Sequence, residues 1–154
     1  MNTLAETLPV PGMARNLRLY PWFKLSQNLI FWLAIWFLFF QERLSAADAL
    51  ILYAVFDLTT TLLEVPSGYI SDWLGRRKTL IASAVAPFVG MFFFLLGDSF
   101  LAFACGQMLL GLGGALMSGA DSAFLYETLK ANRQEADVEH HEVRAWRFGF
   151  AGFA

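Results

Sequence analysis

Long apolar runs alternate with short polar stretches along this chain. Four runs are long enough for a helix to cross a bilayer, which takes about 20 residues, and they cover residues 20–40, 49–70, 79–96 and 100–125. A polar stretch follows, and the chain turns apolar again shortly before its last residue. The pattern predicts an all-α membrane protein with four transmembrane helices and the start of a fifth. Its expected segments are an N-terminal tail (1–19), helices 1–4 (20–126), a loop (127–142) and a truncated fifth helix (143–154).

The composition indicates that lipid surrounds much of the chain. The sequence is 57% hydrophobic and only 16% charged, against roughly 25% charged residues in an average soluble domain. A soluble fold of this size could not cover so much apolar surface, so we expect the lipid bilayer as a partner. The net charge of −2 gives no indication of a nucleic-acid partner.

Basic residues mark one side of the expected membrane protein. Lys and Arg in short loops favour the cytoplasmic side. They precede the first apolar run and follow the second and fourth runs, whereas the opposite side carries Arg43 alone. We therefore expect a multi-pass protein of the cell (inner) membrane with a cytoplasmic N-terminus. The residues on that side are Arg15, Arg18, Lys24, Arg76, Arg77, Lys78, Lys130, Arg133, Arg144 and Arg147.

The loop between the second and third runs combines an acid, two glycines and a basic cluster. Gly68 leaves room for a neighbouring helix to approach the end of the second span. Asp72 can cap the following helix or face the positive end of another helix. Gly75 permits a left-handed turn, and Arg76 and Arg77 lie where positive charge meets lipid headgroups. An ordinary positive-inside loop does not require the acid and both glycines at this spacing.

This loop resembles that of the major facilitator superfamily, which reads Gly-x-x-x-Asp-x-x-Gly-Arg-Arg/Lys between its second and third helices. The resemblance implies a carrier of about twelve helices in two six-helix halves. This chain would supply the first four helices and part of the fifth, and the C-terminal half of the carrier would be a missing partner.

In that family the loop aspartate lies against a helix of the second half, and the loop arginine pairs with an acid at the cytoplasmic end of the fourth helix. The resemblance therefore implies that Asp72 and Arg76 hold the outward-open state. The pairing acid would be Glu127, with Asp121 as the alternative. The expected latch residues are Gly68, Asp72, Gly75, Arg76, Arg77 and Glu127.

The fourth apolar run carries a weaker match. Proton-driven members of the superfamily often show Arg-x-x-x-Gly-x-Gly there, and this chain has Gln107, Gly111 and Gly113 in that spacing. The glycines fit and the positive charge is absent. The end of the run, residues 119–129, resembles a bacterial drug-efflux-like branch of the superfamily.

Acidic side chains inside the apolar runs are candidate coupling groups. Asp57 and Glu64 lie seven residues apart in the second run, and Asp121 ends the fourth. An ionised carboxylate at such depth costs several kcal/mol unless it is paired or hydrated, so a role in proton or substrate coupling is our first hypothesis. The alternative is a hydrogen-bonded carboxyl that faces a helix partner.

The family also implies that the first and fourth helices line a central cavity. Asn28, Trp32 and Gln107 are therefore the candidate substrate contacts. His140 and His141 adjoin several acids, and we interpret them as part of a solvated loop because adjacent histidines project differently and no ligand spacing recurs.

The sequence shows no catalytic constellation, no phosphate-binding glycine loop and no cofactor motif. We interpret the chain as part of a secondary active transporter for a small-molecule substrate, with proton-coupled efflux as the candidate mode, and not as an enzyme. The alternative is a small four-helix membrane protein that acts as an assembly or interaction partner.

The charge pattern makes a topology prediction. A phosphatase reporter fused after Ser99 is expected to be active, because that turn lies outside, and a fusion after Lys130 is expected to be inactive. Enzyme assays on cells that carry each fusion test this. The reverse pattern would contradict the predicted orientation.

Overall fold

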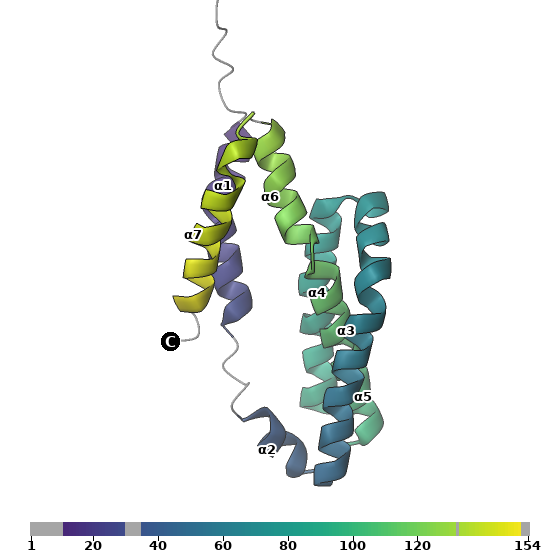
Figure 1. Cartoon of the computed structure of the whole chain (residues 1–154). Coiled ribbons are helices and arrows are strands. Elements are labelled where there is room, and N and C mark those ends of the chain that lie inside the picture. The colour runs from purple at the N-terminus through teal and green to yellow at the C-terminus, as the bar shows by residue number, and fades with distance from the viewer. Residues whose placement is uncertain (1–10, 30–34, 132, 152–154) are drawn as a thin grey trace, which may run out of the picture. The chain divides into compact units, whose positions relative to one another are not determined.

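The computed structural model describes residues 11–29, 35–131 and 133–151, and every regular element in them is helical (Figure 1). The all-α prediction is confirmed. Within these residues, three segments are long and apolar enough to cross a membrane: Ala46–Leu74, Arg76–Leu96 and Phe100–Ala131. The elements are α1 (Pro11–Asn28), α2 (Trp36–Gln41), α3 (Ala46–Leu74), α4 (Arg76–Leu96), α5 (Phe100–Met117), α6 (Ala120–Ala131), the 3-10 helix η1 (Glu135–Asp137) and α7 (Val138–Ala151).

The chain divides into two compact units. The first unit comprises residues 1–31 and 124–154, and the second comprises residues 32–123, so that α6 contributes to both. In the first unit α1 packs against α7. Its buried core consists of Tyr20, Leu125, Leu129 and Ala145.

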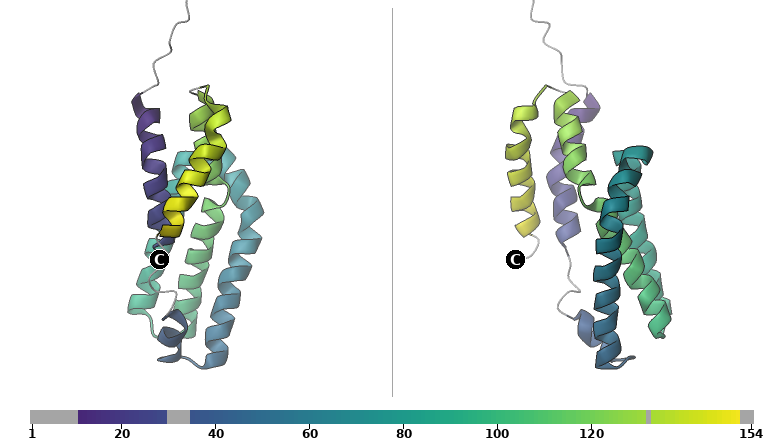
Figure 2. Two further views of the ribbon diagram at one scale, coloured as in Figure 1. Left: turned by 60° about the vertical axis from the view of Figure 1, so that its left-hand side comes forward. Right: turned by 45° about the vertical axis from the view of Figure 1, so that its right-hand side comes forward.

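The second unit is built around α5, which packs along both α3 and α4 (Figure 2). An aromatic cluster closes one end of this unit. The ring centroids of Trp36 and Phe94 lie 4.9 Å apart, and those of Phe40 and Phe103 lie 5.4 Å apart. Edge-to-face and tilted aromatic pairs of this kind contribute about 0.5–1.5 kcal/mol beyond their burial. The cluster joins α2 to the end of α4 and the start of α5.

Glycines on α5 let its backbone approach both neighbours. A Cβ at Gly106 would lie 2.5 Å from the Phe94 ring on α4, and a Cβ at Gly111 would lie 2.9 Å from the Phe56 carbonyl oxygen on α3. A Cβ at Gly113 would overlap the Pro87 ring on α4. Small residues at helix interfaces are the usual means of close packing in membranes. The glycine content of the fourth apolar run therefore has a packing role in this unit.

Serine residues cap the helices at the end of the second unit that carries the aromatic cluster. The Ser45 hydroxyl accepts a 3.1 Å hydrogen bond from the Asp48 backbone N–H at the start of α3, and it donates a 2.7 Å bond to the Asp48 carboxylate. Ser99 caps α5 by accepting a 3.3 Å bond from the Ala102 N–H. These bonds satisfy backbone donors that have no partner within the helix.

The predicted fourth span is interrupted. It was expected to run unbroken over residues 100–125, but α5 ends at Met117 and α6 begins at Ala120. Ser118 has φ −54° and ψ 117°, and Gly119 has φ +76°. These angles are those of a type II turn, whose third position favours glycine because φ is positive. The candidate span Phe100–Ala131 is therefore made of two helices joined by a turn.

Helix bounds also differ near both ends of the chain. α1 begins at Pro11, inside the expected tail, and ends at Asn28, whereas α2 begins at Trp36. Residues 30–34 lie outside the described residues, so a single first span over 20–40 stays a prediction. The stretch 127–142, expected as a loop, is largely helical, because α6 extends to Ala131 and α7 begins at Val138.

Adjacent glycines on α5 provide a matched test of this packing. Gly113→Ala is expected to destabilise the fold by about 1–3 kcal/mol, because the new methyl group meets the rigid Pro87 ring. Gly114→Ala is expected to be neutral or to stabilise by up to about 1 kcal/mol, because alanine is the better helix former and its Cβ would meet only Thr60 Cγ2 at 3.9 Å. Unfolding in detergent followed by circular dichroism measures both. Equal shifts for the two variants would contradict the role given to Gly113.

Candidate functional site

The motif between α3 and α4 forms a compact, locally bonded turn. Gly75 has φ +90° and ψ 143°, a positive-φ conformation that favours glycine. Its N–H donates to the Ser71 carbonyl at 3.0 Å. The Arg76 guanidinium bonds back to α3, with one nitrogen 2.5 Å from an Asp72 carboxylate oxygen and another 2.8 Å from the Ser71 hydroxyl. The arginine and the aspartate of the motif are therefore direct partners.

Asp72 was expected either to cap the following helix or to face the positive end of another helix. The start of α4 has Gly75 as its N-cap and no side-chain capping bond, so Asp72 does not cap that helix. Gly68 is exposed, and a Cβ built on it would meet nothing within 4 Å in the described part of the chain. The expected close approach of a helix at Gly68 therefore has no counterpart among these residues. Arg77 and Lys78 are exposed.

The expected pairing of Arg76 with an acid of the fourth helix stays a prediction. Glu127 lies in α6 within the first unit, whereas Arg76 belongs to the second unit. The alternative acid, Asp121, is buried in the first turn of α6, and its carboxylate accepts a 2.7 Å hydrogen bond from the Ser122 N–H.

The two acids of α3 have different surroundings. A Glu64 carboxylate oxygen accepts a 3.1 Å hydrogen bond from the Ser118 hydroxyl at the end of α5. Asp57 is exposed and makes no hydrogen bond or ion pair with the described residues. Between them, the Thr60 hydroxyl donates to the Phe56 carbonyl at 2.9 Å and reaches the Gly111 carbonyl at 3.5 Å. The α3–α5 interface thus carries polar contacts as well as close packing.

Gln107 is the most unusual of the candidate substrate contacts. Its side chain is only 2% exposed, and its amide forms no hydrogen bond with any residue that the structure describes. A buried polar group without a partner costs about 1–3 kcal/mol. Gln107 precedes Gly111 by one helical turn and therefore shares its face of α5.

The other two substrate candidates differ from Gln107. Asn28 donates a 2.8 Å hydrogen bond to the Lys24 carbonyl of its own helix, and its amide would lie 2.7 Å from a Cβ at Gly149 of α7. It therefore packs inside the first unit. Trp32 lies outside the described residues. A common site for these three side chains stays a prediction.

The two histidines lie near the start of α7, with ring centroids 5.8 Å apart. Burial and then the neighbouring His140 lower the pKa of His141. No group of three or more His, Cys, Asp or Glu side chains in the described ranges is placed to hold a metal ion.

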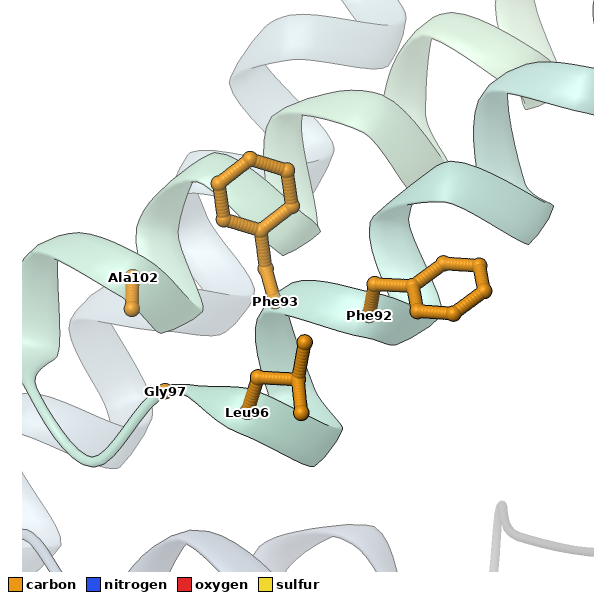
Figure 3. Close-up of a pocket in the computed structure, with 5 residues that line it drawn as sticks. All are labelled: Phe92, Phe93, Leu96, Gly97 and Ala102. Carbon is orange, nitrogen blue, oxygen red and sulfur yellow. The ribbon is translucent and has the colours of Figure 1, made fainter.

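A small apolar hollow of about 280 Å³ lies where α4 turns into α5 (Figure 3). Its lining is Phe92, Phe93, Leu96, Gly97 and Ala102. These side chains offer no hydrogen-bonding group. The hollow therefore lacks the polar groups that orient a solute in a binding site.

Sequence reasoning missed two contacts between distant segments. Arg43, after α2, forms an ion pair of 2.8 Å with Asp98, in the turn before α5. Ser118 forms the bond to Glu64 described above. The charge pattern placed Arg43 and Asp98 on one side of the membrane, which was the available signal for the first contact. Nothing in the pattern singled out Ser118 as a hydroxyl donor to α3.

Comparison with known proteins identifies the family. Residues 24–150 match the family model described as sugar (and other) transporter. The chain belongs to this family. Its members are transporters of the major facilitator type and not enzymes, so the superfamily resemblance of the loop motif is confirmed, as is a multi-pass membrane protein. The drug-efflux-like branch finds no support in the match.

One relative adds detail on how far the likeness extends. Monosaccharide-sensing protein 2 of Arabidopsis thaliana is 35% identical over 68 residues, which is 44% of this chain and 9% of that protein. The chain thus spans a small part of the length of this relative. No solved structure matches the chain.

Proposed function

We propose that the chain contributes the first helices of a secondary active transporter that moves a small solute by alternating access. The family match over residues 24–150 is the observation that carries this proposal. In such carriers the solute site lies near the midplane, between two halves that rock against each other. The proposed arrangement has residues 1–19 as a cytoplasmic tail, helices 1–4 within 20–126, a cytoplasmic loop at 127–142 and a fifth helix from 143, in the cell (inner) membrane.

The proposed substrate is a small solute rich in hydroxyl groups, of monosaccharide size. The family description and the name of the plant relative both point to sugars. The amide of Gln107 supports this class, because it offers both donors and an acceptor, as hydroxyl recognition requires. The amide forms no hydrogen bond with the described residues, so its hydrogen-bonding capacity is unused there. Asn28 and Trp32 are proposed as further contacts.

Proton coupling is a separate part of the proposal. A carboxyl group in the membrane can carry a proton because desolvation favours its neutral form. Asp57 is the first candidate, since it has no partner within the described part of the chain. Glu64 is the second and Asp121 the third. The proposed direction of transport is efflux driven by protons. A transport assay that shows uptake would contradict this direction.

The latch is proposed as the conformational control. The cytoplasmic turn would be shaped by Gly68, Gly75 and Arg77. Asp72 would contact a helix of the second half. Arg76 would leave Asp72 to form an ion pair with Glu127 of the fourth helix. The short Asp72–Arg76 pair supports a role for this arginine in charge pairing at that level.

The second half of the carrier is the proposed missing partner. Purified residues 1–154 in liposomes are expected to insert and not to transport, because the midplane site requires both halves. Saturable solute movement by this chain alone would instead favour a self-assembling four-helix protein. The proposed function is tested by measuring counterflow of radiolabelled monosaccharides into these liposomes, with a complete carrier as the reference.

Gln107 allows stability and transport to be separated. Gln107→Leu in the complete carrier is expected to raise stability by about 1–3 kcal/mol, because it removes a buried polar group that has no hydrogen-bond partner among the described residues. It is expected to lower uptake about tenfold or more, as the loss of a solute hydrogen bond does. Thermal unfolding and solute uptake measure the two effects, and Met108→Leu at the exposed neighbouring position is the control. Gln107→Leu with unchanged transport would exclude this contact.

The latch makes a second functional prediction. Arg76→Ala is expected to impair transport more than Lys78→Ala, because Lys78 is exposed and serves as a headgroup anchor. Exchange of the charges, Arg76→Glu with Glu127→Arg, is expected to restore part of the activity if the two side chains pair directly. Initial transport rates in proteoliposomes test both. Equal and mild losses for the two alanine variants would reduce the motif to a topology signal.

A further inference from the structure

A groove of about 370 Å³ lies between α2 and the last turns of α4 in the second unit. Its walls are aromatic and aliphatic, with Trp36 and Phe39 from α2 and Met91 and Leu95 from α4. Among the described residues that line it, Arg43, in the turn after α2, is the one charged side chain. The volume falls within the range of about 300–1,000 Å³ that is typical of ligand sites. The groove is separate from the latch and from Gln107.

The groove opens at the level of lipid headgroups. α3 starts just after Arg43 and has 29 residues, which correspond to about 43 Å of helix. A bilayer with its headgroup regions is about 40–45 Å thick. Arg43 and its partner Asp98 therefore lie at the headgroup level opposite the basic loop after α3. Leu95 and Met91 lie progressively deeper, beside the hydrocarbon chains.

The two charges at this level have unused hydrogen-bonding capacity. Arg43 Nε lies 2.8 Å from Asp98 Oδ1, and the two side chains are 37% and 82% exposed. The guanidinium also lies 5.3 Å from the centroid of the Phe39 ring, which helps to hold it in place. Within the described residues, the terminal nitrogens of Arg43 and the second oxygen of Asp98 form no other hydrogen bond or ion pair. Cationic donors and an anionic acceptor thus stand side by side above an apolar groove.

We propose that this groove binds a phospholipid whose headgroup carries a primary amine, such as a phosphatidylethanolamine. The phosphate bonds to the terminal nitrogens of Arg43, which suit phosphate oxygens. The ammonium group donates to Asp98, and part of one acyl chain covers Trp36, Met91 and Leu95.

Charge complementarity excludes the other common headgroups as the preferred ligand. A purely anionic headgroup would meet the Asp98 carboxylate and gain nothing from it. A choline headgroup carries positive charge but has no N–H to donate. A free phosphate compound would leave the apolar walls of the groove uncovered.

Trp36 supplies a local probe for the test. A variant of the chain that retains only this tryptophan is placed in phosphatidylcholine bilayers, and its fluorescence is quenched by lipids brominated on their acyl chains. Brominated phosphatidylethanolamine is expected to quench about two- to fivefold more effectively than brominated phosphatidylcholine at the same mole fraction, the range that exposed charge contacts give. The tryptophans replaced by phenylalanine are Trp22, Trp32, Trp73 and Trp146.

Charge variants test whether the Arg43–Asp98 pair causes the preference for phosphatidylethanolamine. Arg43→Gln and Asp98→Asn are each expected to remove it, and Arg43→Lys to keep part of it. Glu42→Gln is the matched control, because Glu42 is an exposed acid in the same turn and does not line the groove. Native mass spectrometry of the unsubstituted chain with mixed lipids gives a second measure of the same preference.

Three results would overturn the inference. Equal quenching by the two lipids would show annular lipid only. A preference that survives both Arg43→Gln and Asp98→Asn would place the lipid elsewhere. Glycerophosphoethanolamine has the headgroup but no acyl chains. If it displaced the brominated phosphatidylethanolamine as well as intact phosphatidylethanolamine does, the apolar groove would contribute nothing to binding. None of these outcomes depends on whether the carrier transports a solute.

Discussion

The close approach of the α5 backbone to α3 and α4 is the constraint on which the second unit depends. Apolar side chains gain little by leaving lipid for a helix interface, so membrane helices associate through packing and hydrogen bonds. Gly106 and Gly113 lie seven residues apart and face α4, while Gly111 faces α3. These glycines let the α5 backbone approach both neighbouring helices closely. Larger residues at these positions would separate the helices and weaken the aromatic cluster at the end of the bundle.

The two interfaces of α5 differ in chemistry. Against α4 the contacts are apolar and rigid, with the Phe94 ring at Gly106 and the Pro87 ring at Gly113. Against α3 they include the Thr60 hydroxyl near the Gly111 carbonyl and the Ser118–Glu64 bond. Interhelical hydrogen bonds of this kind contribute on the order of 0.6 kcal/mol each in membranes. The α3 interface thus adds hydrogen bonds to close packing, whereas the α4 contacts at these glycines rest on packing.

Hydropathy predicted the long helices that consist of one uninterrupted apolar run. The second and third spans were expected at 49–70 and 79–96 and are helical over Ala46–Leu74 and Arg76–Leu96. The break at Ser118–Gly119 escaped notice because a turn of two small residues does not change the local hydropathy. The Arg43–Asp98 pair escaped because its residues lie in different turns, and only packing decides which exposed charges meet. The site residues follow the same division. The positive φ of Gly75 could be expected from its residue type in a turn, whereas the burial of Gln107 depends on how the helices pack.

The exposure of the Asp72–Arg76 pair determines how much the pair stabilises the turn. Asp72 is 67% exposed and its partner 23%, and exposed ion pairs contribute about 0–1 kcal/mol. The Arg76 guanidinium is held in addition by the Ser71 hydroxyl, 2.8 Å away, so the ion pair is not its sole contact. In a fully buried pair, by contrast, removing one partner would leave an uncompensated charge that costs several kcal/mol. The exposure of the motif, more than the presence of its charges, therefore keeps the free-energy cost of separating Asp72 from Arg76 low.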